Sequence, residues 1–462
     1  MISTKKSIKD DKYNFYMMNL KSQLKDIRSI NGDSKIIRIY NEIISVIKNQ
    51  PYNEGNYNLL FKKINLLILH NDYKNNNCDK DIVNNIQKIC YTMLFNINMN
   101  DYFEKVSSLY EKNEDNDIDF KNYLINRNDA MNSLPIGQRK SKLTILIQKI
   151  LGGLGLKTFL KNNLPNIGCD IMFHDTTNNE QLKIATARHP CPTYVPEGFI
   201  GSIKSVVRVI IAIISRFLPN IFLCYTNEKI TPSYLEAIKH LEKNNERVLY
   251  VNLQRVNDNG KFENEGTRSN NLSKINNKNF HLLNQELDRD FFTKKGKYAT
   301  TATFAELKNH IIDKYEEEEA GPVFDTVHKL FFGKKLNINE NEYQQCILMF
   351  YVFQKFETLC KHEITHASSI CKDDNDRGGV MKLIENMYRA LITDKWSENE
   401  WKKEAAKHLL GPCFMNRTSG VIEHRLKLAL PIYELFNSIS KENIKLEMLQ
   451  EHKFDGKYKL VG

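Results

Sequence analysis

Residues 364–379 read Ile-Thr-His-Ala-Ser-Ser-Ile-Cys-Lys-Asp-Asp-Asn-Asp-Arg-Gly-Gly, and they indicate an order of secondary structure. Residues 364–370 carry branched and small side chains that favour a strand, and they lead directly into Cys371. After the two glycines, apolar residues recur at helical spacing: Val380, Leu383, Ile384, Met387 and Leu391. The sequence therefore predicts a strand, a short loop and a helix, in that order.

Five residues separate Cys371 from Arg377, the spacing that a cysteine-dependent phosphatase needs. Such a loop can wrap its backbone N–H groups around a phosphate, with the sulfur beneath the phosphorus and the guanidinium on two oxygens. The N-terminus of the following helix favours both the phosphate and the thiolate. A chain with nine cysteines contains about 0.3 such matches by chance, so the strand and helix around the motif carry the argument.

Each residue type in the loop has an expected role. Cys371 is the candidate nucleophile, and Arg377 is the candidate ligand of the phosphate oxygens. Either Asp373 or Asp376 could protonate the leaving group, and both could instead orient the arginine or the loop amides. The rest of the expected phosphate-binding loop is Lys372, Asp374, Asn375, Gly378 and Gly379. The alternative for the cysteine is an ordinary small buried residue.

The pattern Cys371-x-Asp373-x-x-Asp376-Arg377 resembles the loop of the Sac-domain phosphoinositide phosphatases. The wider arrangement is similar to the C-x5-R lipid phosphatases that intracellular bacterial pathogens inject into host cells. The segments that carry this wider similarity are Leu-Tyr-Val-Asn-Leu-Gln-Arg at 249–255, Glu-Gly-Thr-Arg-Ser at 265–269, the aromatic stretch before the motif, and Arg417 with Glu-His-Arg-Leu at 423–426. The resemblance spans roughly residues 140–460 and is specific only at the loop.

The resemblance implies a tyrosine-phosphatase-like α/β fold, in which helices flank a central sheet. It implies hydrolysis of phosphate monoesters of phosphoinositides or inositol phosphates through a phosphocysteine intermediate, with no cofactor. It also implies delivery by a dedicated secretion system into the host cytosol, at or near host membranes. Gly378 departs from the pattern, because Thr or Ser usually stands there and helps the sulfur to leave. Turnover could be slower, a nearby hydroxyl (Thr365, Ser368 or Ser369) could substitute, or the protein could be an inactive phosphoinositide-binding module.

A rival motif, His362-Glu363-x-x-His366, lies nine residues upstream of the cysteine. On a helix it would place two imidazoles on one face for Zn²⁺, with Glu363 as base and Glu385 as a third ligand, as in a zinc metallopeptidase. Against this, Lys361 would stand beside the dication, residues from 364 onward favour a strand, and Glu385 fits the exposed side of the following helix. Zinc chemistry is therefore the second hypothesis.

The chain divides into a helical, Asn- and Asp-rich region at 1–135 and a catalytic α/β region at 136–462. Within the second region, 221–225 and 247–253 are expected strands around a helix at 232–241, which predicts a β-α-β unit. Residues 256–280 are polar and are expected to form a loop, and an aromatic helix is expected at 341–359. Residues 143–165 are apolar and interrupted by glycines. An apolar helix with a basic stripe, either buried or lying on anionic lipid, is expected at 198–220.

Charge indicates an anionic partner. The net charge is +10, and residues 136–225 hold eleven Lys or Arg against four acids, an excess of +7. This block suits a phosphorylated lipid or an anionic membrane surface, although a solvated face with a chance excess would look the same. No zinc-finger spacing or aromatic-basic RNA signature accompanies it, so nucleic acid is not an expected partner. No apolar run follows Met1, so no signal peptide is expected. Arg208, Arg216 and the nearby Pro219 disfavour a transmembrane helix at 198–220. The odd, scattered cysteines favour reduced thiols.

Overall fold

The computed structural model describes residues 2–49, 51–102, 105, 118–133, 166–188, 192–194, 229–256, 265–287, 290–315, 319–371, 377–412, 421 and 423–461. The expected strand at 221–225, the apolar segments at 143–165 and 198–220, and most of the basic block lie outside these residues. Within the described part of the block, Lys183 forms an ion pair of 2.6 Å with Asp170. None of the described helices combines the length and apolarity that crossing a bilayer requires.

The described residues before 103 are mostly helical. Their helices are α1 (Ile2–Gln23), α2 (Lys35–Lys48), α3 (Glu54–Ile68), α4 (Asn71–Lys74) and α5 (Lys80–Tyr91), followed by a π-helical turn at Thr92–Asn96. Side chains cap the starts of α2 to α5; at α2 Ser34 accepts from the Ile37 amide, and at α3 Asn53 accepts from the Asn56 amide. Five apolar residues of α2 that lie on one helix face are buried: Ile36, Tyr40, Ile43, Ile44 and Ile47.

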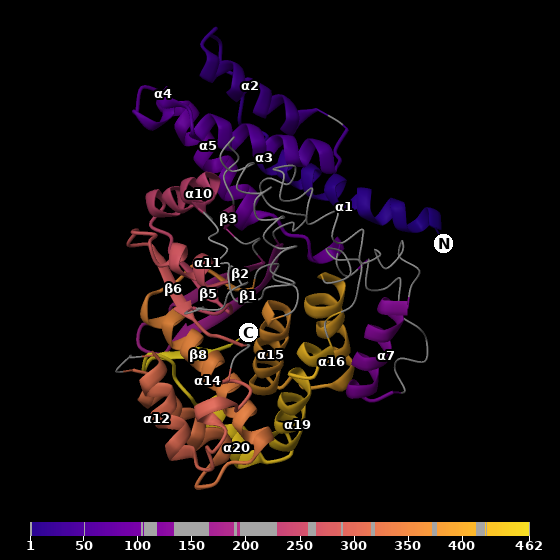
Figure 1. Ribbon diagram of the computed structural model, residues 1–462, viewed down its shortest axis with the longest axis vertical. Helices are drawn as coiled ribbons and strands as arrows, with labels where there is room; N and C mark the ends of the chain where they lie inside the picture. Colours follow the sequence, from indigo (N-terminus) through magenta and orange to yellow (C-terminus); the bar gives the residue numbers. More distant parts are fainter. Residues whose placement is uncertain are drawn as a thin grey trace, which may run out of the picture.

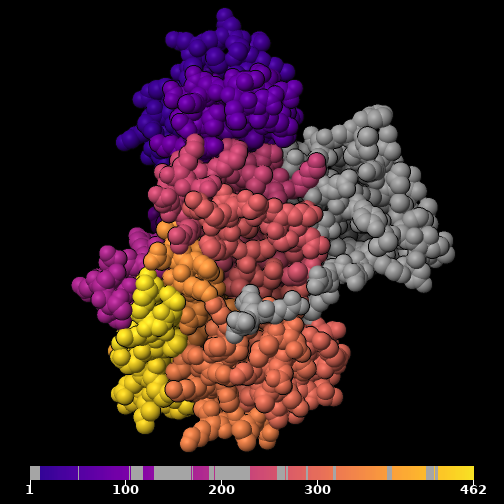
Figure 2. Space-filling model, turned by 90° about the vertical axis from the view of Figure 1, so that its left-hand side faces the viewer, coloured from indigo at the N-terminus to yellow at the C-terminus, as the bar shows by residue number. Residues whose placement is uncertain are grey.

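Helix α7 (Phe120–Ser133) packs away from the other N-terminal helices and against the C-terminal ones. The ring of Phe120 lies 4.8 Å from that of Tyr433, and the Asn128 amide exchanges two hydrogen bonds with the backbone of Val421. In Figures 1 and 2 α7 lies on the flank of the molecule beside the C-terminal helices, while α2 to α5 lie at the top of both views. The expected boundary near residue 135 remains a prediction.

A mixed six-stranded sheet forms the centre of the fold, in the order β6-β5-β7-β2-β1-β8. Its strands are β1 (Asn166–Asp175), β2 (Gln181–Arg188), β5 (Val248–Asn252), β6 (Phe280–Asn284), β7 (His366–Ile370) and β8 (Tyr458–Leu460). Strands β6, β5, β7 and β2 run parallel, whereas β1 is antiparallel to β2 and to β8. All five residues of β5 and of β7 are buried, as parallel strands covered on both faces require. A separate antiparallel pair joins β3 (Thr193–Tyr194) to β4 (Lys229–Ile230).

Helices flank this sheet, which confirms the α/β class with a central sheet, while the tyrosine-phosphatase-like topology remains a prediction (Figure 1). The helices after β4 are α10 (Pro232–Lys243), α11 (Glu265–Leu272), α12 (Phe304–Tyr315), α13 (Ala320–Val327), α14 (Glu340–Lys361), α15 (Arg377–Ile392), α16 (Glu398–Ala405), α18 (Glu423–Leu426), α19 (Ala429–Ile439) and α20 (Asn443–Gln450). A 3-10 turn at Gly296–Tyr298 and π-helical turns at His328–Phe332 and Ala406–Leu410 complete the set.

Several expected elements are confirmed, and one is wrong. Helix α10 begins at Pro232, β5 matches the strand expected at 247–253, and α14 matches the aromatic helix expected at 341–359. A capping box between Asn339 and Glu342 starts α14. The loop expected at 256–280 is wrong, because α11 occupies its middle and β6 begins at its end. Among the α11 residues whose burial is described, Gly266, Ser269 and Leu272 are buried, and they form no apolar stripe.

Candidate functional site

The junction of β7 and α15 contains the candidate nucleophile and the candidate arginine. Strand β7 ends at Ile370, Cys371 is the next residue, and α15 begins at Arg377. The order of strand, interval and helix is the one expected from the sequence. The loop residues between them lie outside the described part of the chain: Lys372, Asp373, Asp374, Asn375 and Asp376. The two ends of the motif are therefore placed, and the roles of the five loop residues remain predictions.

Cys371 lies at the carboxyl edge of the parallel strands. Strand β7 is bordered by β5 and β2, and the amide of Leu253 donates a hydrogen bond of 2.9 Å to Ile370 O, which carries the pairing to the end of the strand. Only 4% of Cys371 is exposed. In open α/β sheets, ligands bind beside the carboxyl ends of the strands. The cysteine occupies such a position.

Arg377 reaches across to the neighbouring strand. Its guanidinium Nη1 donates a hydrogen bond of 2.8 Å to the carbonyl oxygen of Leu253, the residue after β5. The side chain is half-buried, so one part of the fork is fixed by the backbone of the β5 end. The arginine of the motif is thus held at the same sheet edge as the cysteine.

Gly379 permits close packing of the start of α15. A Cβ at this position would lie 3.1 Å from Leu409 Cδ1 and 3.2 Å from the carbonyl oxygen of His408. Both neighbours belong to the π-helical turn at Ala406–Leu410. This glycine therefore has a packing role in the described structure, and Gly378 beside it is also buried.

Two further arginines bring distant segments to the same edge. Arg255 follows β5, and its carbonyl oxygen accepts a hydrogen bond of 2.8 Å from Ser269 of α11. Arg425 of α18 is buried and donates to the carbonyl oxygen of Leu287, three residues after the end of β6. Asn252, the last residue of β5, joins β5 to α11 and β6, because its amide nitrogen lies 2.8 Å from the Ser269 hydroxyl and 2.9 Å from Asn284 Oδ1. The segments 249–255 and 265–269 therefore meet at this edge of the sheet, whereas Arg417 lies outside the described residues.

A buried ion pair lies behind the junction. Lys355 Nζ of α14 lies 2.7 and 2.8 Å from the two carboxylate oxygens of Glu385 on α15, and 3.0 Å from Ser369 Oγ on β7. The interpretation of Glu385 as an exposed residue is wrong, since only 3% of it is exposed. Its carboxylate pairs with Lys355, thirty residues earlier in the chain, and local periodicity does not reveal this pairing.

The three hydroxyls that could replace the missing Thr or Ser after the arginine have other surroundings. Ser369 Oγ is bound within the Lys355 and Glu385 pair, and the Thr365 hydroxyl bonds the backbone of Arg247. Ser368 is buried in the middle of β7. The departure at Gly378 is therefore not offset by the hydroxyl of Ser369 or Thr365.

The string His362-Glu363-x-x-His366 does not lie on one helix. Helix α14 ends at Lys361, and Glu363 has a positive φ of 46°, so the chain turns inside the motif. The His362 ring stacks on His281 at 4.4 Å, whereas the His366 ring packs against Tyr91 at 5.8 Å. The two histidines also do not share a strand face, because only His366 belongs to β7.

The titration of these histidines does not decide the question. Burial lowers the pKa of His366 to about 4 and, with the neighbouring His362, that of His281 to about 4, which leaves the neutral imidazole that a metal would need. The positions of the groups count against zinc. Glu385, the expected third ligand, is engaged by Lys355. Within the described residues, no group of three His, Cys, Asp or Glu side chains is arranged to hold a metal ion. The residues proposed as a metallopeptidase site are thus spread over three separate environments.

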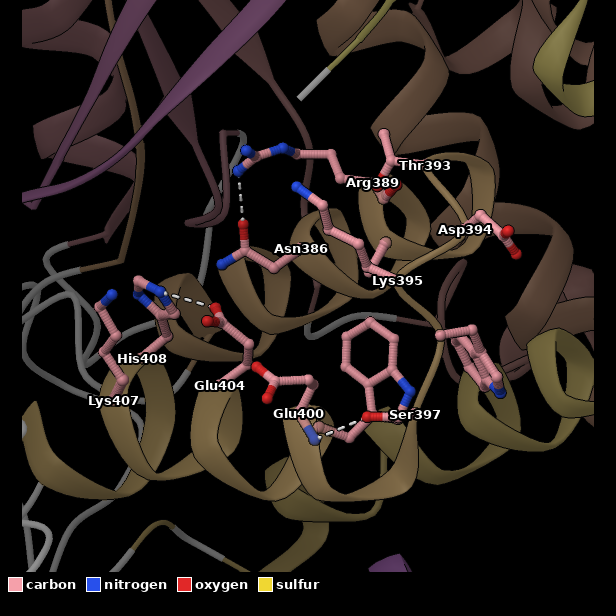
Figure 3. Close-up of a pocket in the computed structure, with 13 residues that line it drawn as sticks. Asn386, Arg389, Thr393, Asp394, Lys395, Ser397, Glu400, Glu404, Lys407 and His408 are labelled. Carbon is pink, nitrogen blue, oxygen red and sulfur yellow. Dashed lines mark hydrogen bonds and ion pairs between the residues drawn. The ribbon is translucent and has the colours of Figure 1, made fainter.

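A pocket of about 530 Å³ lies on another side of α15, against α16 and the turn that follows it (Figure 3). Three cations and three carboxylates line it: Arg389, Lys395 and Lys407, with Asp394, Glu400 and Glu404. Glu404 pairs with His408 at 3.0 Å, and Arg389 donates to Asn386 (Figure 3). Neither Cys371 nor Arg377 lines this pocket, and its balanced charge gives no preference for a phosphate.

Comparison of the chain with protein-family models, curated proteins and solved structures finds no match. The function is therefore argued from the residues and geometry of the site.

Proposed function

We propose that the chain is a cysteine-dependent phosphatase of the C-x5-R type. One observation carries this proposal: Cys371 directly follows the strand β7 within the parallel part of the sheet, and Arg377 begins the next helix with its guanidinium at the end of the adjacent strand. This is the arrangement in which a thiolate and a guanidinium can act on one phosphate. A structural cysteine would need neither the spacing nor the arginine.

The reaction would proceed in two displacements. Cys371 Sγ attacks phosphorus, the P–O bond to the leaving group breaks, and the leaving oxygen takes a proton from Asp373 or Asp376. Water then gives a proton to the same carboxylate and attacks phosphorus of the phosphocysteine, and the P–S bond breaks to release inorganic phosphate and regenerate the thiolate. Arg377 binds two phosphate oxygens in both steps, and the N-terminus of α15 favours the negative charge. The backbone amides of the loop, with Lys372, would complete the anion site.

Phosphoinositides or inositol phosphates are the substrate class that best suits this edge of the sheet. Arg255 follows β5, Arg377 begins α15, and Arg425 of α18 bonds the backbone that follows β6, so three arginine-bearing segments come together at this edge. A substrate with several phosphates would match such a group. The +7 excess in residues 136–225 supports the same class of anion. Action in the cytosol of a host cell, after secretion, belongs to this proposal through the resemblance of the loop.

An anionic membrane surface is the proposed partner. A groove of about 410 Å³ between α10, α11 and β4 is lined by Lys229, Lys239 and Lys274, and none of its described lining residues is a carboxylate. Ile230 and Leu235 also line it, and Leu235 is 37% exposed. Lysines beside apolar side chains suit phospholipid headgroups.

The Cys371→Ser variant tests the catalytic proposal on vesicles that contain phosphoinositides. We expect phosphate release by the parent and none by the variant, with lipid binding retained by both. Binding by the parent without any release would instead support an inactive phosphoinositide-binding module. This hypothesis arises from Gly378, which stands where Thr or Ser is usual.

A further inference from the structure

Lys355, Ser369 and Glu385 form a closed polar cluster inside the core. The ammonium of Lys355 has three hydrogens and three acceptors, namely both oxygens of Glu385 and the hydroxyl of Ser369. Ser369 Oγ also lies 3.3 Å from Glu385 Oε1, to which it donates. The side chains of the lysine and the glutamate are 1% and 4% exposed. The cluster is therefore buried, and its polar groups are paired with one another.

Net stability does not account for such a cluster. Removing an ammonium and a carboxylate from water costs several kcal/mol per ion, and apolar residues of similar volume often serve as well or better. The charged cluster instead constrains the relative positions of the three elements that supply it, because its hydrogen bonds tolerate only small displacements. Apolar contacts alone would let α15 slide along the sheet at a smaller cost.

The three residues sit where such direction affects the candidate site. Ser369 precedes Cys371 by two residues on β7, and Glu385 follows Arg377 by eight residues on α15, about 12 Å along the helix. Lys355 of α14 joins the two from beneath. The cluster therefore couples the strand that carries the cysteine to the helix that carries the arginine.

We propose that Lys355, Ser369 and Glu385 are positioning residues that fix the register of α15 against β7, and with it the placement of Arg377 and the helix N-terminus relative to Cys371. This inference rests on the proposed phosphatase function for its kinetic consequence. Its geometric consequence, the environment of the Cys371 thiol, does not depend on catalysis.

The main test is the double variant Lys355→Met with Glu385→Leu, which removes both charges and keeps the volume. We expect its melting temperature to stay within a few degrees of the parent or to rise, because no unpaired charge is left. Its kcat should fall at least about tenfold with KM changed less than about threefold, since binding is retained while the reacting groups are misplaced. The rate of Cys371 alkylation by iodoacetamide at pH 7, followed by peptide mass spectrometry, should fall as well.

Two further variants test the positioning role independently of whether the double variant folds. Ser369→Ala removes only a hydroxyl, so it should fold even if the double variant does not, and it should lower kcat and the alkylation rate in the same direction. Glu236→Gln disturbs a buried carboxylate on α10, away from the junction, and should alter stability without altering either rate. Parental kcat and alkylation in the folded cluster variants would overturn the positioning role. A protein that releases no phosphate but shows the fall in alkylation would refute the phosphatase proposal alone.

Discussion

The guanidinium of Arg377 donates a hydrogen bond of 2.8 Å to the carbonyl oxygen of Leu253, a residue 124 positions earlier in the chain. Leu253 in turn donates its amide to Ile370, the residue before Cys371. One backbone unit at the end of β5 therefore contacts both sides of the motif. In the proposed phosphatase, this contact would hold the arginine at the sheet edge before substrate binds and so lower the cost of ordering it during catalysis.

Replacing Arg377 with lysine should reduce phosphate release by about 100-fold or more. Lysine keeps the charge but loses the planar fork that can bind Leu253 and phosphate together. The comparison is of kcat on a soluble inositol phosphate, with circular dichroism to show that the variant is folded. A lysine variant with parental kcat would mean that the fork has no role beyond its charge.

The Gly379→Ala variant should lower the free energy of unfolding by about 1–3 kcal/mol, because the new methyl group meets a carbonyl oxygen at 3.2 Å and Leu409 at 3.1 Å. Urea unfolding measures the change. The matched control is Gly321→Ala on α13, where the nearest atom would lie at an ordinary 3.4 Å and the helix should gain stability. Equal effects at the two positions would refute the packing role of Gly379.

Acid should destabilise the fold partly through His366. Its folded-state pKa of about 4 lies below the ordinary 6.5, so the unfolded chain takes up the proton first and stability is lost as the pH falls from 6.5 to 4. His281 and His452, with pKa values also lowered to about 4, act in the same sense. Glu246 lies 3.9 Å from His366 and acts oppositely, because burial raises its pKa.

The His366→Gln variant isolates this contribution. It should lose less stability between pH 6.5 and 4 than the parent, by up to about 3 kcal/mol, since a glutamine amide does not titrate. Chemical unfolding at the two pH values gives the difference. Parallel pH profiles for parent and variant would show that His366 is not held neutral by the fold.

Reversing two charges in the lysine-lined groove should weaken membrane binding. The variant Lys229→Glu with Lys274→Glu is expected to bind vesicles of 20–30% phosphatidylserine at least about tenfold more weakly, because each lysine near an anionic surface contributes about 1 kcal/mol. Sedimentation with vesicles measures the partition. The control Lys441→Glu with Lys445→Glu makes the same charge change at the α19–α20 end. If both pairs reduce binding equally, net charge and not the groove is responsible.

Elements with strong apolar periodicity could be predicted from the sequence, and pairings between distant residues could not. The stripe from Val380 to Leu391 predicts α15, and the branched residues before Cys371 predict β7. Helix α11 could not be predicted, because its sequence is rich in Asn and its buried residues, among them Ser269 and Leu272, form no apolar stripe. The motif at 362–366 suggested a zinc site on a helix, but the sequence alone does not show that the chain turns at Glu363.

Glu385 shows the same limit within the site. Its place in the sequence suits an exposed helix face, but the side chain is buried in the core, where it pairs with Lys355 of another helix. The spacing of Cys371 and Arg377 could be found from the sequence. The contact with Leu253, which places the arginine, depends on β5 and β7 being neighbours and could not.

Phosphate release by purified parent and Cys371→Ser protein on phosphoinositide vesicles, together with trapping of the intermediate by rapid acid quench, tests whether Cys371 is the nucleophile. We expect release by the parent, a phosphorus adduct of Cys371 in its mass spectrum, and neither signal in the variant. Full release by the Cys371→Ser protein would contradict the phosphatase proposal.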